Sequence, residues 1–321
     1  MKYIFLTNPA AGKKNSCDEL CAAIDAVCAK EELSYEIYRT TSVGDATRFV
    51  RQTCENNTQN EELCFFACGG DGTLNEVVSG TVGYPFAYVG LIPKGTGNDF
   101  VRNFTNTERF FDIGAQIKGS PVTVDLLGCN DKYAVNMINI GFDCEVVKKM
   151  VQIKRSPLVP SKLAYIFGLV FTLVKKPGVH TKISFDGAEY TEHGLLLTTM
   201  ANGCFCGGGF HSNPRASLTD GNIDSLLINN VSRIKFLSLV SSYKKGTHLG
   251  PKNDSILSSN TCKTLDMVFD GIQSISIDGE LNDIDRELHI KVLPAALRFI
   301  VPEGCAFVKE ENTAVNEKTL V

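Results

Sequence analysis

Three short loops rich in glycine and small polar residues carry the residue types that bind phosphate groups. They are residues 8–12, 69–73 and 94–99, and each follows an apolar run. Glycine lets the backbone approach a phosphate closely, and the free N–H groups at the start of a following helix attract its negative charge. A strand–Gly–Gly–helix turn is also compatible with a tight connection alone. Because three such loops occur in sequence, we interpret them as parts of one phosphate site.

Two aspartates in these loops indicate a metal ion. Asp71 lies in the second loop and Asp99 ends the third. An ionised carboxylate only accepts hydrogen bonds, so it repels phosphate unless a cation lies between them. Mg²⁺ keeps several waters and bridges one or two carboxylates to phosphates, which makes this pair a candidate magnesium site. For either aspartate alone, the alternative is capping of a turn.

The first hundred residues alternate between strand and helix patterns that would bring the loops together. We expect strands at 2–6, 34–39, 63–68 and 88–92, and helices at 16–28, 45–55 and 74–79. Ser16 and Glu19 form a capping box at the start of the first helix. Strands separated by helices predict a parallel sheet with right-handed crossovers. Such sheets bind ligands at the carboxyl ends of their strands, where all three loops lie.

After about Pro121, strand-like runs follow one another and are separated by Asp-Gly turns at 186–187, 270–271 and 278–279. We expect strands at 122–127, 133–138, 182–185, 195–200, 223–228, 265–269, 272–277, 288–292 and 297–301, and helices at 144–153, 162–175 and 233–245. The fold class is therefore an α/β Rossmann-like nucleotide-binding domain plus a mainly antiparallel β-sandwich domain. The expected domains are 1–121 and 122–295, and a C-terminal segment, 296–321, that returns to the first domain.

The composition is that of a soluble globular protein. Of 321 residues, 43% are hydrophobic and 21% are charged, and the net charge of −4 argues against a general nucleic-acid surface. The longest apolar run, residues 163–174, is shorter than the roughly twenty residues that span a bilayer. The N-terminus lacks the apolar core of a secretory signal. We therefore expect a cytoplasmic protein.

The twelve cysteines are scattered along the chain, and we expect reduced, mostly buried thiols. Cys17, Cys21 and Cys28 share one apolar helix face and fit a core better than a metal site. The spacing of Cys204, Cys206 and His211 fits no common zinc finger.

Several ordered motifs resemble those of one enzyme family. NPAAG at 8–12, GGDGTLNEVV at 69–78 and PKGTGNDF at 93–100 are similar to motifs of the diacylglycerol kinase catalytic-domain family, especially the soluble bacterial lipid kinases. In the second half, MINIGFDCEV at 137–146, the Gly-rich segment 201–228 and SIDGE at 276–280 agree with it. The resemblance covers roughly residues 1–302. It implies transfer of the terminal phosphoryl group of ATP to a lipid hydroxyl.

The resemblance also implies which residues contact ATP and cations. The implied ATP contacts are Asn8, Pro9, Ala10, Ala11, Gly12, Thr40, Gly70, Asp71, Gly72, Thr73, Leu74, Asn75, Glu76 and Thr96. Asp125 matches a further acid of the metal network formed with Asp71 and Asp99. Ser217, Asp220 and Asn222 resemble a second, structural cation site, for which the alternative is a simple Asp-Gly turn.

Glu280, in SIDGE, is the expected general base. A lipid alcohol is a weak nucleophile, so phosphoryl transfer gains from a carboxylate that accepts the hydroxyl proton as the new bond forms. Asp71 is the competing candidate, because the corresponding aspartate of related sphingosine kinases is often given this role.

A stretch of forty residues, 146–185, contains eight lysines and arginines and no acid. Together with the apolar run inside it, this pattern favours a membrane-facing patch and a peripheral location at the membrane. The alternative is a buried helix with solvated basic ends.

Diacylglycerol is the first expected lipid, and a sphingoid base or another long-chain alcohol is the alternative. An NAD kinase, which also uses a GGDGT loop, and a non-catalytic nucleotide- or lipid-binding regulator remain alternatives in other classes. Dimers are common in such families, but no surface in the sequence identifies one. Cys68, Cys204 and Cys206 depart from the family pattern. We interpret Cys204 and Cys206, where the family often has larger or aromatic residues, as a change in the shape of the cleft, and Cys68 as a small strand residue that oxidation would disturb.

Overall fold

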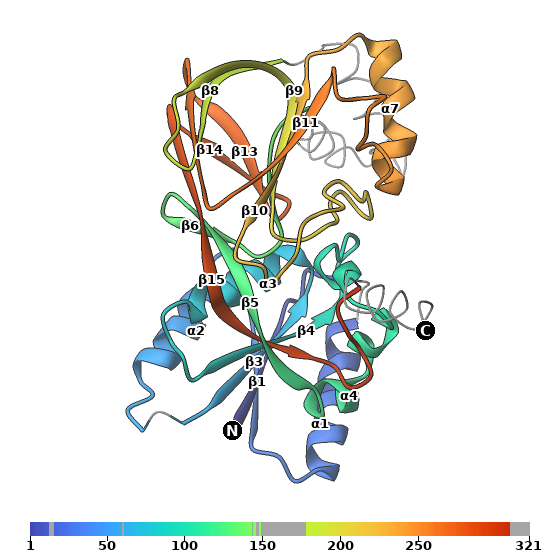
Figure 1. Ribbon diagram of the computed structural model, residues 1–321. Helices are drawn as coiled ribbons and strands as arrows, with labels where there is room; N and C mark the ends of the chain where they lie inside the picture. The colour runs from blue at the N-terminus through green and yellow to red at the C-terminus, as the bar shows by residue number, and fades with distance from the viewer. Residues whose placement is uncertain (13–15, 60, 143, 146–147, 149–177, 309–321) are drawn as a thin grey trace, which may run out of the picture. The chain divides into compact units, whose positions relative to one another are not determined.

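The computed structural model describes residues 1–12, 16–59, 61–142, 144–145, 148 and 178–308 (Figure 1). Its contacts divide the chain into two compact units, one formed by Met1–Leu126 with Pro294–Val321 and the other by Leu127–Leu293. Within the described part of the chain, no helix is long and apolar enough to cross a bilayer.

The first unit contains a parallel sheet with the strand order β4-β3-β1-β2. Its strands and helices are β1 (Lys2–Thr7), α1 (Ser16–Lys30), β2 (Tyr35–Arg39), α2 (Asp45–Glu55), β3 (Leu63–Gly69), α3 (Asp71–Thr81), β4 (Ala87–Pro93), η1 (Phe100–Asn103), η2 (Thr107–Phe111) and α4 (Ile113–Ile117). The chain moves one way from β1 to β2 and the opposite way from β2 to β3. Right-handed crossovers therefore place α1 on one face of the sheet and α2 and α3 on the other, as Figure 1 shows.

Burial explains why the sequences of β3 and β4 are apolar throughout. Every residue of β3 and of β4 is buried, as expected for parallel strands that are covered on both faces. Phe5 of β1 stacks on Phe66 of β3, with ring centroids 4.9 Å apart. The α/β architecture predicted for the first half is confirmed.

Helix α3 begins earlier than the sequence indicated. It starts at Asp71 instead of Leu74, because the extended backbone of Gly70 (φ −94°, ψ −168°) ends the loop there. Asp71, Gly72 and Thr73 therefore form the first turn of the helix. The glycine-rich loop is correspondingly short.

The second unit is a mainly antiparallel, β-sandwich-like domain, as predicted. Its elements are β6 (Lys132–Ala134), β7 (Met137–Gly141), β8 (Val179–Phe185), β9 (Thr191–Ala201), β10 (Ile223–Asn229), α7 (Arg233–Lys245), β11 (Leu257–Cys262), β12 (Thr264–Phe269), β13 (Gln273–Ile277) and β14 (Glu280–Ile284). Two long strands, β5 (Ser120–Cys129) and β15 (Glu287–Val301), contribute residues to both units. The strands of the second unit run in the order β14-β13-β7-β9-β8-β12-β15, and β9 also pairs with β10, which pairs with β11.

Several expected strands differ in extent. The single strand expected at 133–138 is two strands, β6 and β7, and those expected at 288–292 and 297–301 are one strand, β15. Strand β15 continues through a positive φ of 50° at Ala295, whose N–H donates to Asp125 Oδ1 at 2.7 Å. Strands β11 and β14 are additional, because their polar sequences carry no strand signal. The helix at 233–245 is confirmed, and the other two expected helices lie outside the described residues except at 144, 145 and 148.

All twelve cysteines are free, and nine of them are buried. Burial raises the pKa of the Cys54 and Cys262 thiols to about 12, and it also raises the pKa of Cys68. Buried thiols of this kind stay protonated and unreactive at neutral pH.

Asp45 holds the start of α2 through a buried carboxylate. It accepts hydrogen bonds from Thr41 N (2.8 Å), Thr41 Oγ1 (2.9 Å) and the Tyr38 hydroxyl (3.1 Å), and it pairs with Arg48. The side chain is fully buried. The bond from the Thr41 backbone is the main reason why the pKa of this carboxyl lies below its usual value, although burial opposes the shift.

We expect Asp45→Asn to lower the free energy of unfolding by about 2 kcal/mol at pH 7, because charge-assisted hydrogen bonds are lost. The pKa is lower in the folded state than the value of about 3.9 in the unfolded chain. The carboxylate's contribution is therefore fully present above pH ~4 and is lost as pH falls through the folded-state pKa. Urea unfolding at pH 7 and near pH 3 should show the difference between wild type and variant shrink at the lower pH. Asp18→Asn, at an exposed pair with Arg39, is the matched control, and a pH-independent difference at Asp45 would contradict the prediction.

Candidate active site

The loops of the predicted phosphate site follow β1, β3 and β4, three adjacent strands of the parallel sheet. Backbone hydrogen bonds continue the sheet into the loops, from Asn8 N to Cys68 O (3.2 Å) and from Lys94 N to Gly69 O (2.7 Å). The strand order reverses between β1 and β3. Open α/β sheets bind ligands outside the carboxyl ends of the strands at such a point. The fold therefore brings the three loops to the place where a ligand is expected.

The second and third loops touch through glycines. A Cβ atom on Gly95 would lie 2.6 Å from Gly70 Cα, which is closer than any real contact allows. Gly95 must therefore lack a side chain for the loops to meet, whereas a Cβ atom on Gly70 would lie 3.2 Å from Gly95 Cα and make only a tight contact. This contact places Thr96, which is exposed, in the loop beside the first turn of α3.

Asp71 and Asp99 lie together although 28 residues separate them in sequence. Asp99 N donates to Asp71 Oδ1 at 3.0 Å. The Oδ2 atoms of Asp71 and Asp99 lie 2.9 and 3.5 Å from the point that a Cβ atom on Gly97 would occupy. Arg102 Nε lies 3.5 Å from Asp99 Oδ1 and offsets part of the negative charge. The arrangement is a two-carboxylate group at the start of α3.

Asn8 connects the first loop to α3. Its Nδ2 donates to Thr73 Oγ1 (3.2 Å), and its Oδ1 accepts from Ala10 N (2.9 Å). Thr73 is buried, whereas Pro9, Ala10 and Gly12 are exposed at the strand end. The Asn8 side chain thus fixes the position of a loop whose backbone stays accessible.

Some implied ATP contacts hold other parts of the first unit in place. The Glu76 carboxylate accepts from Gly44 N (2.9 Å) and Ala46 N (3.1 Å), so it caps the start of α2. Thr40 donates to Thr7 O through both its N–H (2.9 Å) and its hydroxyl (3.4 Å). The side chain of Leu74 is buried. The ATP contacts of these residues stay predictions.

The other expected cation ligands are also engaged in local structure. Asp125 is buried on β5 and accepts from Ala295 N (2.7 Å). Asp220 Oδ1 accepts from Asn222 N (3.1 Å), and Asn222 Nδ2 donates to Asp220 O (2.9 Å). These bonds describe an Asx turn. No group of three or more His, Cys, Asp and Glu side chains suited to a metal occurs among the residues that the structure describes, so the second cation site stays a prediction.

Glu280 is exposed and is the first residue of β14. The turn before it depends on Asp278, whose carboxylate accepts from Val135 N (2.8 Å), Asn136 N (3.0 Å) and Met137 N (2.9 Å). Asp278 also has a positive φ of 47°. In the sequence this residue is recognisable only as part of an Asp-Gly turn and of the SIDGE motif. Its three backbone partners are about 140 residues away in sequence and carry no recognisable signal.

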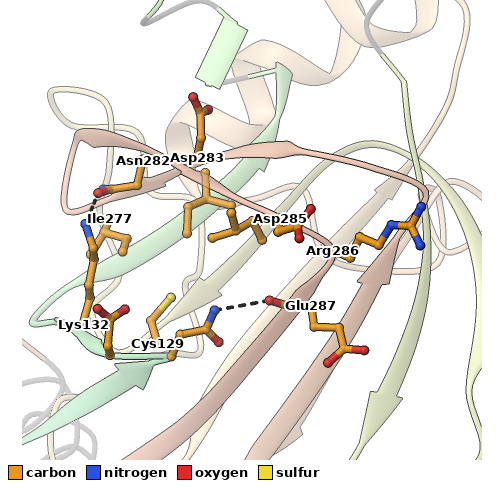
Figure 2. Close-up of a pocket in the computed structure, with 12 residues that line it drawn as sticks. Cys129, Lys132, Ile277, Asn282, Asp283, Asp285, Arg286 and Glu287 are labelled. Carbon is orange, nitrogen blue, oxygen red and sulfur yellow. Dashed lines mark hydrogen bonds between the residues drawn. The ribbon is translucent and has the colours of Figure 1, made fainter.

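Figure 2 shows a pocket of about 470 Å³ in the second unit, near the β13–β14 hairpin and the β5–β6 turn. Lys132 bonds to Asn282, and Asn130 Nδ2 donates to Glu287 O at 3.2 Å. The lining residues are Cys129, Asn130, Asp131, Lys132, Ile275, Ile277, Asn282, Asp283, Ile284, Asp285, Arg286 and Glu287. Four acids against two bases disfavour a polyphosphate. The lining contains none of the implied ATP contacts, so the loops stay the predicted nucleotide site.

Two family matches account for nearly the whole chain. Residues 2–129 match the family "Diacylglycerol kinase catalytic domain", and residues 136–301 match "YegS C-terminal NAD kinase beta sandwich-like domain". The chain belongs to the diacylglycerol kinase catalytic-domain family. This is a family of ATP-using lipid kinases, and its two domains correspond to the α/β and β-sandwich-like halves described above.

The chain is similar to provisionally named lipid kinases of Staphylococcus aureus. One from strain JH9 is 24% identical over 285 residues, which cover 88% of this chain and 90% of the relative. The same two-domain fold occurs in a crystal structure of a provisionally named diacylglycerol kinase from Bacillus anthracis strain Sterne. That structure has a TM-score of 0.73 and 21% identity, and the match covers 94% of this chain and 98% of the other.

An NAD kinase from Archaeoglobus fulgidus, solved in complex with ATP, has a TM-score of 0.51 and 13% identity over 94% of each chain. This likeness shows a shared fold and nothing about the substrate. The family match favours lipid phosphorylation over the NAD kinase alternative.

Proposed function

We propose that this protein transfers the γ-phosphoryl group of ATP to a lipid hydroxyl, with diacylglycerol as the substrate and phosphatidic acid as the product. The observation that carries the proposal is the meeting of three glycine-containing loops beside Asp71 and Asp99. Backbone N–H groups of the loops and the positive end of α3 suit the phosphates of ATP. The family membership supports a lipid as the acceptor. The protein would then work in the cytoplasm and visit the membrane surface.

The two-carboxylate group fits Mg²⁺. Two carboxylates with further oxygens from water and phosphate are the usual ligand set of this ion, so a third acidic side chain is not required. Asp71 and Asp99 would hold it. The chemistry that Mg²⁺ supplies when bound is neutralisation of the charge on the transferring phosphoryl group. The chain's own residues orient the phosphates, and Glu280 accepts the hydroxyl proton of the lipid.

The test is an assay with labelled ATP, Mg²⁺ and a mixed lipid extract, followed by mass spectrometry of the phosphorylated product. Phosphatidic acid is the expected product. If the product is instead a phosphorylated sphingoid base or another long-chain alcohol, the proposed reaction stands and the proposed substrate is wrong. Phosphorylation of NAD with no lipid product, or tight ATP binding without turnover across a lipid panel, would overturn the proposal.

Gly95→Ala is expected to weaken ATP binding at least about tenfold, because the new Cβ atom would overlap the backbone of Gly70 and push two phosphate loops apart. Isothermal titration with a non-hydrolysable ATP analogue measures the change. Gly271→Ala is the matched control, since no atom lies within 4 Å of a Cβ atom at that position. Wild-type affinity in Gly95→Ala would show that the contact between the loops does not position the nucleotide.

A further inference from the structure

Helix α7 lies at the edge of the second unit (Figure 1). It packs on one side and has exposed side chains on the other. Phe236, Leu239 and Tyr243 point into a buried cluster of the second unit. The Ser232 side chain accepts from Lys235 N at the start of the helix, and Gly246, with a φ of 71°, ends it. The helix is thus anchored at its inner face and at both ends, and its outer face is exposed among the described residues.

The outer face carries large apolar side chains in water. Ile234 is 83% exposed, and Leu237, one turn further along, is 55% exposed. Only seven large hydrophobic residues of the described chain are exposed, and α7 provides two of them. Ser238 and Ser241 lie on the same face and are small and exposed. The packing of those residues of the second unit that the structure describes therefore gives no reason for Ile234 and Leu237 to be apolar.

The same helix is basic. Residues 229–253 contain five lysines and arginines and no aspartate or glutamate, in a chain whose net charge is −4. Lys235, Lys244 and Lys245 are exposed around the apolar pair, and Lys244 Nζ also lies 5.8 Å from the centre of the Phe210 ring. By contrast, Lys182, in the basic stretch singled out from the sequence, faces Glu192 at 3.5 Å. Most of that stretch, 149–177, lies outside the described residues.

We propose that the outer face of α7, formed by Ile234, Lys235, Leu237, Lys244 and Lys245, docks on an anionic membrane surface. Exposed apolar residues on a basic helix enter the boundary between headgroups and acyl chains, while the lysines are attracted to anionic lipids. Charge complementarity selects this occupant, because a helix without acids and with several lysines matches a sheet of negative headgroups. This docking role rests on the proposed function, because a lipid kinase must reach a substrate that stays in the bilayer.

The experiment is co-sedimentation of the full chain with vesicles of phosphatidylcholine, alone or with phosphatidylglycerol. Each lysine near an anionic surface contributes about fivefold to partitioning, so the mixed vesicles should bind the wild type at least about tenfold more strongly. Ile234→Ser/Leu237→Ser should lower partitioning at least about tenfold. Lys235→Glu/Lys245→Glu removes two lysines and should lower it at least about 25-fold. Ile272→Ser/Lys291→Glu is the matched control, with an exposed isoleucine and lysine elsewhere in the same unit, and should bind like the wild type.

Undiminished binding of both α7 variants, or equal binding to neutral and anionic vesicles, would overturn the proposal. If the wild type is a dimer and the α7 variants are monomers that bind vesicles as well as the wild type, the outer face of α7 binds a second copy of this chain. That result would also overturn the docking proposal. Phosphoryl transfer to a water-soluble short-chain diacylglycerol should be equal in all variants. Loss of vesicle binding with retained transfer supports docking, whereas vesicle binding without any transfer in the wild type would reject the proposed function and leave the docking surface standing.

Discussion

Asp71→Asn is expected to lower kcat about 1000-fold while the protein stays folded. Asp71 begins α3, accepts from Asp99 N at 3.0 Å and shares the space beside Gly97 with the second carboxylate. The amide preserves shape and one acceptor oxygen but removes the charge that a cation on the phosphates requires. Initial rates at saturating ATP, with thermal unfolding as the check on folding, measure the effect.

The dependence of the rate on magnesium and pH separates the two roles considered for Asp71. If Asp71 acts on the metal side, the Mg²⁺ concentration for half-maximal activity rises in Asp71→Asn and the pH profile keeps its acidic limb. If it is the general base, the acidic limb disappears and the magnesium requirement is unchanged. Asp18→Asn, at an exposed position on α1, is the control. Wild-type kcat in Asp71→Asn would exclude both roles.

Glu280→Gln is expected to lower kcat at least about 100-fold and to leave ATP binding unchanged. The side chain is exposed at the first residue of β14, and the preceding turn is fixed by the three hydrogen bonds that Asp278 accepts. Glutamine keeps the size of the side chain but accepts a proton poorly. Steady-state kinetics with diacylglycerol and titration with an ATP analogue give the two quantities.

Glu189→Gln, an exposed glutamate in another turn of the same unit, is the matched control for Glu280→Gln and should keep full activity. The loss in Glu280→Gln should be largest near neutral pH and should remove the acidic limb of the rate profile. An unchanged kcat would refute Glu280 as the base and favour Asp71.

The fold class could be predicted because its determinants are local. The apolar runs at β3 and β4, the helical spacing over α2 and the Asp-Gly turns of the second half each depend on residues close in sequence. The position of the glycine loops at strand ends follows from the same alternation. Strands β11 and β14 of the second half were not predicted, because their sequences have no apolar pattern that would indicate a strand.

The alternating α/β half, the mainly antiparallel half and the residue types of a phosphate site can be predicted from the amino-acid sequence. Which carboxylates meet, and which groups each one binds, becomes clear only from the folded chain. Asp71 joins Asp99, Glu76 caps α2, and Asp278 holds the backbone at 135–137. The physical reason is that these contacts join distant residues, so they depend on strand order and register, which no short pattern encodes.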